Sequence, residues 1–348
     1  MKNLKKVIWA TAILGLIICG FFAYSIYDAI FTPNTSFGNK DANIYIPSDA
    51  SVNEVKEQLS PLLKDWSTFE AVAKRKGYTS NIKGGKYVIK QGMNNNDIVN
   101  ALRSRNIPVK VSFNNQETVE ALAGRIASQL EADSVSLVEA FNNVDFLKSN
   151  DFNEDTKLSL YLPNTYEFYW NTNAKDFRNK MLKEYKRFWN DERKAKAKAL
   201  NLTPNKVVTL AAIVQKETVK VDERPKVAGV YLNRLRKGIP LQADPTVIYA
   251  IKKETGNYDT IIKRVLYRDL EMESPYNTYK NSGLPPGPIT MPDISSINAV
   301  LNPEKHEYLY FVANVSNFGY HMFAKTLAQH NRNKEQYIRW LNNQQIRR

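Results

Sequence analysis

The hydrophobic pattern begins with an uncharged, mostly apolar stretch over residues 7–27, which follows Lys2, Lys5 and Lys6. A helix of about 21 residues is long enough to cross a hydrocarbon core of roughly 30 Å. Lysines next to such a helix favour the cytoplasmic side of the membrane. The pattern therefore predicts a cytoplasmic N-terminus over residues 1–6 and a single transmembrane helix, with the rest of the chain outside the cytoplasm.

Two other interpretations of this apolar stretch have weaker support. A cleaved signal peptide normally has an apolar region of about 7–15 residues and a small-x-small cleavage site. Here the apolar region is longer, and no clear site of that kind follows it. A lipoprotein would use Cys19, but the bulky Ile18 stands where a small residue is expected. We therefore expect a retained anchor.

Beyond the anchor, the pattern divides the chain into three parts. Residues 28–42 are polar and predict a linker. In residues 43–105, short β-rich runs flank segments with helical spacing of apolar residues, which predicts a small mixed module. Residues 106–348 show mainly helical periodicity with a few short strands, and 176–200 predicts one long charged helix. The expected fold class is α+β.

Charge and composition narrow the expected partners. Lys and Arg number 49 against 35 Asp and Glu, for a net charge of +14, which favours an anionic partner or simply solubility. Outside the cytoplasm, the nearest anionic polymer is the cell wall, whose peptides carry free carboxylates, so we expect no nucleic acid. One cysteine and three widely spaced histidines exclude a Cys-based metal site and an HExxH motif. We expect no metal and no cofactor.

One predicted helix carries a carboxylate on its apolar face. Glu217 lies seven residues after Leu210 and three after Val214, which places all three on one side of a helix. Burial of a carboxylate is unfavourable unless it is paired, and burial raises its pKa. A general acid that works near neutral pH needs such a raised pKa. The alternative is a structural glutamate paired with Arg224 or Lys216.

Two later segments offer groups suited to sugar hydroxyls and ring faces. The loop 241–246 combines an amide, a carboxylate and a hydroxyl, and 276–279 is aromatic and amide-rich. The candidate substrate-binding residues are Gln242, Asp244, Thr246, Tyr276, Asn277, Tyr279 and His321. A helix cap explains Asp244 equally well, and a surface position explains His321. The rigid turn 283–288 is typical of a groove wall.

In the same order along the chain, several blocks resemble the endolytic murein transglycosylases, the MltG (YceG-like) family. The matching blocks are 211–218, 233–235, 241–249, 276–279, 283–288 and 308–313, followed by His321. The resemblance implies a bacterial inner-membrane protein with a LysM-like module and a periplasmic catalytic domain. It also implies that Glu217 is the catalytic residue and that cell-wall synthases are partners.

The same resemblance implies the reaction. Such an enzyme cleaves the MurNAc-GlcNAc β-1,4 bond of nascent peptidoglycan strands, leaves a 1,6-anhydroMurNAc end and terminates strand elongation. This chain departs from the family at Gln215, where many members have a second glutamate, which points to Glu217 as the working residue. Further upstream, Asn164 replaces an aspartate, and Asn114 and Asn115 stand near an expected Glu-Gly pair.

Two other functions remain open from the sequence. A muramidase that uses water would need a second carboxylate, for which Asp244 is the candidate. A membrane-anchored scaffold that only binds the wall would hold glycan through the LysM-like module. The mass of the product separates the two enzymes, since an anhydro end lacks one water. Loss of cleavage with retained binding in Glu217→Gln would argue against the scaffold.

Overall fold

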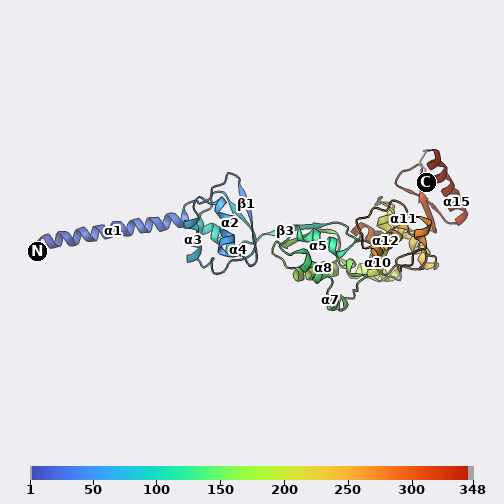
Figure 1. Ribbon diagram of the computed structural model, residues 1–348, viewed down its shortest axis with the longest axis horizontal. Helices are drawn as coiled ribbons and strands as arrows, with labels where there is room; N and C mark the ends of the chain where they lie inside the picture. Colours follow the sequence, from blue (N-terminus) through green and yellow to red (C-terminus); the bar gives the residue numbers. More distant parts are fainter. Residues whose placement is uncertain (1, 344–348) are drawn as a thin grey trace. The chain divides into compact units, whose positions relative to one another are not determined.

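The computed structural model describes residues 2–343, which form two compact units (Figure 1). Unit 1 contains the chain up to Val111, together with Gln129–Ala132 and Tyr166–Asn173. Unit 2 contains Ser112–Ser128, Asp133–Thr165 and the chain from Ala174 onward. Helices and short strands occur in both units, which confirms the predicted α+β class. The two units interleave along the chain. The domain boundaries inferred from the sequence remain predictions.

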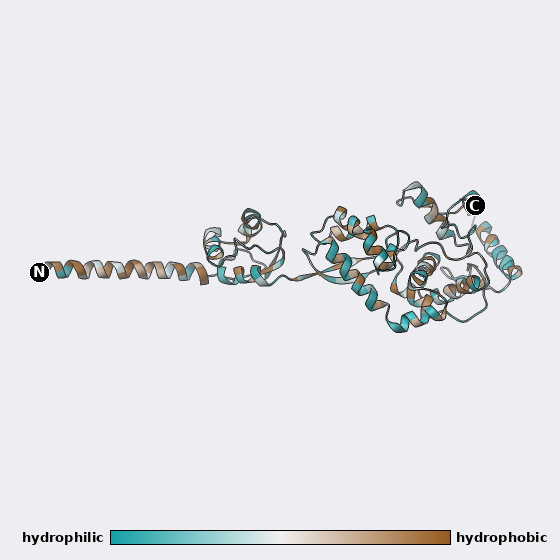
Figure 2. Cartoon of the chain, turned by 90° about the horizontal axis from the view of Figure 1, so that it is seen from below, coloured by the Kyte–Doolittle hydropathy of each residue, from teal (hydrophilic) through white to brown (hydrophobic). Residues whose placement is uncertain are grey.

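The first helix, α1 (Lys2–Phe31), is long and apolar. In its segment Leu4–Phe31, the most apolar 18-residue window has a mean hydropathy of 2.2, and none of that window is buried. Hydrophobic residues predominate along the helix in Figure 2. A helix satisfies its own backbone hydrogen bonds, as a hydrocarbon environment requires. The helix is therefore compatible with a membrane anchor.

Within unit 1, residues 41–104 form a small module around one two-stranded antiparallel sheet. Its elements are β1 (Asp41–Ile46), α2 (Val52–Leu59), η1 (Ser60–Leu62), α3 (Trp66–Arg75), β2 (Gly85–Lys90) and α4 (Asn95–Ser104). The sheet pairs β1 with β2, from Asp41 opposite Lys90 to Ile46 opposite Gly85. The α2 helix begins at a capping box, in which the Ser51 and Glu54 side chains each bond the other's backbone N–H.

The segment that the sequence pattern describes as a linker packs against this module. Asn34 and Thr35 are buried, and the Asn34 side-chain amide donates to Asn95 Oδ1 over 2.7 Å. Asn95 in turn donates to the carbonyl oxygen of Ala29, in the last turn of α1, over 2.8 Å. The end of α1 and the module are thus joined by hydrogen bonds between buried side chains and backbone.

Short strands and many helices make up the remainder of the chain. A second two-stranded sheet joins β3 (Pro108–Phe113) and β4 (Asn164–Tyr169), and a third joins β5 (Tyr310–Ala313) and β6 (His321–Ala324). The helices of unit 2 are α5 (Val119–Ala127), α6 (Ser134–Phe141), α7 (Val144–Ser149), η2 (Lys157–Leu160), α8 (Ala174–Phe188), α9 (Asp191–Ala199), α10 (Pro204–Glu217), α11 (Arg224–Arg236), α12 (Asp244–Thr255), α13 (Tyr267–Leu270), α14 (Ile294–Leu301) and α15 (Leu327–Asn343).

The prediction of one long helix over 176–200 is wrong. The chain forms α8 and α9 instead, separated at Trp189 and Asn190. Trp189 is buried in the core, and Asn190 has an extended backbone conformation. The Asn190 side chain accepts the backbone N–H of Arg193, so it starts a new helix as an N-cap.

The central helix of unit 2 is α10, which carries the candidate catalytic residue at its end. Thr203 caps its N-terminus, and Pro204 occupies the first turn, where a missing N–H is harmless. Every residue from Val207 to Val214 is buried, in a core shared with α11, α12 and α14. The helix ends at Glu217, because Thr218 takes an extended conformation. A heavily buried helix therefore fixes the position of Glu217.

Candidate active site

Glu217 is half-buried at the C-terminal end of α10. Its Oε1 accepts a hydrogen bond from the Tyr231 hydroxyl over 2.7 Å. The pKa of Glu217 is raised to about 7: burial raises it most, the hydrogen bond from Tyr231 opposes the rise, and the charge of Asp244 adds to it. The negative end of the helix dipole also disfavours the charged form at this position. Glu217 can therefore both donate and accept a proton near neutral pH.

Tyr231 holds its hydroxyl against Glu217 from the neighbouring helix, α11. Its side chain is 2% exposed, and its ring meets the Phe311 ring edge-on at 5.8 Å. Burial, together with the charge of Glu217, raises the pKa of Tyr231 well above its usual range. The phenol therefore stays protonated and remains a hydrogen-bond donor to Glu217.

Arg234 lies one turn beyond Tyr231 and ties α11 to the loop before α12. Its Nε donates to the carbonyl oxygen of Leu309 over 2.6 Å. Its Nη1 donates to the carbonyl oxygens of Pro240 and Leu241 and to Gln242 Oε1 over 3.3 Å. All of these acceptors are neutral, and the guanidinium is buried. Its positive charge lowers the pKa of Glu217.

Asp244 and Tyr279 form the opposite part of the site. The Tyr279 hydroxyl donates to Asp244 Oδ1 over 2.6 Å, and the Asp244 side chain is exposed. Asp244 is the first residue of α12, whose N-cap is Ala243, so it does not serve as the side-chain cap of this helix. Gln242 is also exposed and has a positive φ of 50°. The charges of Asp244 and Glu217 both raise the pKa of Tyr279, and the charge of Asp244 raises the pKa of Glu217, so the three residues lie in one site.

Three other candidate residues have their polar groups occupied within the protein. Thr246 Oγ1 donates to the Ala243 carbonyl oxygen over 2.7 Å. The Asn277 side-chain amide donates to the carbonyl oxygens of Leu270 and Met272, each over 2.8 Å. The Tyr276 hydroxyl donates to Asp155 Oδ1 over 3.0 Å. Thr246, Tyr276 and Asn277 are buried, so their contribution is to the shape of the loops that carry Asp244 and Tyr279.

The turn at 283–288 depends on a glycine beside Asp155. A Cβ atom at Gly287 would lie 1.8 Å from the backbone oxygen of Asp155. Asp155 also accepts the Tyr276 hydroxyl. The turn and the loop at Tyr276 therefore converge on the same residue.

His321 begins β6 and is held by a residue that the sequence patterns did not single out, Glu223. Glu223 Oε1 accepts the backbone N–H of His321 over 2.7 Å, and Glu223 Oε2 contacts His321 Nδ1 at 2.8 Å. An electrostatic interaction with His321 lowers the pKa of Glu217, so His321 lies near this carboxyl. The only sequence signal for Glu223 is its position six residues after Glu217, at the start of a helix.

The contacts of the neighbouring charged residues exclude a structural ion pair for Glu217. Lys216 bonds Glu117 over 2.6 Å, and Arg224 donates to Ser295 Oγ over 2.7 Å. Neither cation therefore pairs with Glu217, although the sequence left both pairings open. Gln215 also has a separate role, since its Oε1 accepts the backbone N–H of Asp293 over 2.6 Å, at the start of α14.

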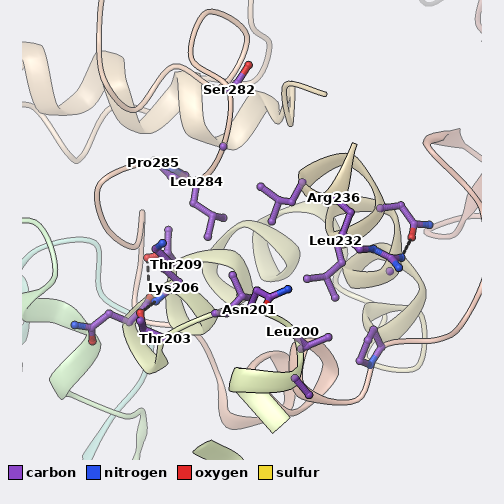
Figure 3. Close-up of a pocket in the computed structure, with 18 of the residues that line it drawn as sticks. Leu200, Asn201, Thr203, Lys206, Thr209, Leu232, Arg236, Ser282, Leu284 and Pro285 are labelled. Carbon is purple, nitrogen blue, oxygen red and sulfur yellow. Dashed lines mark hydrogen bonds between the residues drawn. The ribbon is translucent and has the colours of Figure 1, made fainter. Parts of the chain in front are cut away.

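A cavity of about 1140 Å³ lies on another face of α11 (Figure 3). Leu232 of α11 and Leu284 of the 283–288 turn line it, together with Lys206 from the first turns of α10. Glu217 and Asp244 do not line this cavity. The turn thus forms a cavity wall, as its sequence suggested, but that cavity is separate from the site at Glu217. In residues 2–343 no cluster of His, Cys, Asp and Glu could hold a metal ion.

Comparisons with known proteins agree on one family. The model of the YceG-like family matches residues 44–336. A Bacillus subtilis (strain 168) protein named endolytic murein transglycosylase is 34% identical over 93% of this chain and 91% of its own length. A protein of the same name from Streptococcus pneumoniae serotype 2 is 28% identical over 92% of this chain, which spans 62% of that relative.

A crystal structure of a yceG-like protein from Listeria monocytogenes has a similar fold. It aligns with a TM-score of 0.56 and 30% identity, over 85% of this chain and 99% of that one. The family match covers both the small module and the residues around Glu217. The chain belongs to the YceG-like family.

Proposed function

We propose that this protein is a lytic transglycosylase that cuts peptidoglycan glycan strands with Glu217 as its single acid/base. The names of the Bacillus and Streptococcus relatives support the enzyme class. The observation that carries the proposed role of Glu217 is its half-buried position at the end of α10, where the Tyr231 hydroxyl donates to its carboxyl. A pKa of about 7, in a carboxyl bonded to Tyr231, suits a group that must give a proton and take one back.

The proposed reaction cleaves the MurNAc-GlcNAc β-1,4 bond in two steps. Protonated Glu217 first gives its proton to the glycosidic oxygen, which leaves with the GlcNAc side. The resulting carboxylate then takes the proton of the muramyl C6 hydroxyl as that oxygen bonds to the anomeric carbon of the same ring. The product carries a 1,6-anhydroMurNAc end, no water is consumed, and Glu217 is protonated again.

The neighbours of Glu217 support both steps. The Tyr231 hydroxyl and the Arg234 charge stabilise the carboxylate form that follows the first proton transfer. Positive charge develops on the sugar ring during cleavage, and the exposed carboxylate of Asp244 is placed to stabilise it. We assign direct sugar contacts to Gln242, Asp244, Tyr279 and His321.

The alternative enzyme is a muramidase in which Asp244 activates a water molecule. A muramidase needs two carboxylates in one site, and the proximity of Asp244 to Glu217 meets that requirement. The Tyr279 hydroxyl already occupies one oxygen of Asp244. Asp244 is therefore better suited to act as a fixed stabilising charge than as a base that activates water.

The proposed setting is the outer face of the cytoplasmic membrane. With α1 as the anchor and Lys2, Lys5 and Lys6 on the cytoplasmic side, both the module and the catalytic unit lie in the periplasm. There the enzyme would meet strands as synthases produce them, and cutting would end their elongation. The small module, with its paired β1 and β2, is proposed to be LysM-like and to hold glycan. Protease added to intact spheroplasts tests the orientation, since it should digest the C-terminal unit.

The test of the reaction is a digest of purified glycan strands by the full chain in detergent, with mass analysis of the new ends. We expect internal cuts and ends that lack one water relative to a reducing end. Glu217→Gln should abolish cleavage, while Lys216→Gln, one residue away and bonded to Glu117, should retain it. Reducing ends would indicate the muramidase. Binding without cleavage by the wild-type chain would indicate the scaffold.

A further inference from the structure

The Glu223 carboxylate, at the end of the turn between α10 and α11, is hydrogen-bonded to His321 at the start of β6. Both oxygens of Glu223 are engaged by His321, one by the backbone N–H and the other by Nδ1. The side chains are largely buried, with 4% of Glu223 and 15% of His321 exposed. A paired contact of this kind sets the direction of the imidazole ring as well as its position.

The ionisation of Glu223 determines where the His321 proton lies. Burial pushes the pKa of Glu223 upward, but the hydrogen bonds from His321 outweigh burial and lower it below its usual value. A carboxylate has no proton to donate. Nδ1 of His321 must therefore carry the hydrogen of the bond to Glu223. Nε2, the other ring nitrogen, makes no hydrogen bond within residues 2–343.

The ring of His321 belongs to the packing around Glu217. It meets the Phe311 ring edge-on at 5.0 Å, and Phe311 in turn packs edge-on against Tyr231 at 5.8 Å. Tyr231 bonds Glu217 directly. A rotation of the His321 ring would therefore disturb the wall behind the catalytic carboxyl, and Glu223 opposes that rotation.

We infer that Glu223 is a positioning residue, which holds His321 with Nδ1 protonated so that Nε2 contacts the amino sugar bound at Glu217. The chemical class of the contact is a hydroxyl or acetamido group of the glycan. This inference rests on the proposed function, because it assigns a sugar to the space beside Glu217. Glu223 touches no reacting atom, and we assign its effect to His321, although its side chain also interacts with Thr218, the residue after Glu217.

A matched control lies next to Glu223 in the same turn. Asp222 accepts the Tyr320 hydroxyl over 2.9 Å, so it also joins this turn to the segment before β6. That contact is exposed and involves neither His321 nor Glu217. Asp222→Asn therefore measures the effect of a carboxylate change in this turn that leaves His321 untouched. We expect its cleavage rate to stay within about twofold of wild type.

The first experiment is nitrogen NMR of the full chain in detergent micelles with labelled histidine. Only three histidines are present, so His321→Gln assigns the signal of His321 by its disappearance. We expect a protonated Nδ1 in wild type and in Asp222→Asn. In Glu223→Gln the amide can donate to Nδ1, so the proton should move to Nε2. An unprotonated Nδ1 in wild type would overturn the inference.

The second experiment is a double-mutant cycle on cleavage of purified glycan strands. Glu223→Gln alone should lower kcat/KM by about 100-fold, the scale expected for a misplaced contact group. In a His321→Gln background, the same change should have little further effect. An equal loss in both backgrounds would overturn the inference, because Glu223 would then act without His321.

The outcomes separate this inference from the proposed function. If Glu217→Gln retains activity, the proposed function fails, whatever the state of His321. If Glu217→Gln is inactive but Glu223→Gln cleaves normally, only the positioning role fails. Glu223→Asp keeps a carboxylate for Nδ1, so it should preserve the Nδ1 proton and recover part of the rate. Loss of the Nδ1 signature in Glu223→Asp would also count against the role.

Discussion

Tyr231 of α11 donates its phenolic hydrogen to Oε1 of Glu217 over 2.7 Å. The two residues are fourteen positions apart in the sequence, and the packing of α10 against α11 brings them together. This bond favours the carboxylate form of Glu217, whereas burial and the charge of Asp244 favour the protonated form. The balance of these opposing influences leaves the pKa at about 7.

We expect Tyr231→Phe to move the pH dependence of cleavage upward. Removal of the hydroxyl removes an interaction that lowers the pKa of Glu217. The first step needs protonated Glu217, so activity falls as the pH rises through this pKa. In Tyr231→Phe the fall should occur above the wild-type value of about 7. The measurement is kcat/KM against pH, and a downward movement would contradict the assignment.

We expect Asp244→Asn to move the high-pH fall in kcat/KM in the opposite direction, toward lower pH. The charge of Asp244 raises the pKa of Glu217, so its removal should bring the fall in kcat/KM to lower pH. The maximal rate should also decrease, because a charge that stabilises the developing positive sugar is lost. Tyr279→Phe serves as the comparison, since it leaves the Asp244 carboxylate in place. An unchanged pH profile in Asp244→Asn would show that the two carboxylates do not interact.

The raised pKa of Glu217 also predicts a pH-dependent stability. Between about pH 4.5 and about pH 7 the folded chain keeps this proton while the unfolded chain releases it. The free energy of unfolding therefore falls as the pH rises through that window, by at most about 3 kcal/mol. Glu217→Gln has no such group, so it should exceed the wild type in melting temperature at about pH 8.5 and match it near pH 4. A constant difference across this range would contradict the raised pKa.

We expect Gly287→Ala to destabilise unit 2. The new Cβ would lie 1.8 Å from the Asp155 backbone oxygen, which cannot move as a flexible side chain would. Overpacking of this kind costs about 1–3 kcal/mol or more. Gly124→Ala is the control, because no atom lies within 4 Å of its Cβ position and it sits inside α5. Differential scanning calorimetry should show a lower melting temperature only for Gly287→Ala.

Local periodicity accounts for what the sequence could predict. The position of Glu217 on the buried side of α10 follows from helical spacing, and α1 follows from a long uncharged run. The 176–200 prediction failed because Asn190, a residue common in helix caps, interrupts an otherwise continuous helical pattern.

Most features that the sequence could not predict depend on contacts between distant segments. Glu223 and His321 are 98 positions apart, so no local pattern links them. In irregular loops, the residue type does not reveal which way a side chain points. Tyr276 and Asn277 have groups suited to sugars, yet they are buried and bond Asp155, Leu270 and Met272 instead.

The hydrogen bonds that join Ala29, Asn34 and Asn95 have a consequence for where glycan would be held. A flexible tether would let the small module sample a range of heights above the lipid surface. Because the last turn of α1 is bonded directly into the module, a membrane that held α1, as we propose, would hold the module at a distance set by the fold. A glycan strand bound by the module, as proposed, would then lie at one constant distance from the lipid surface.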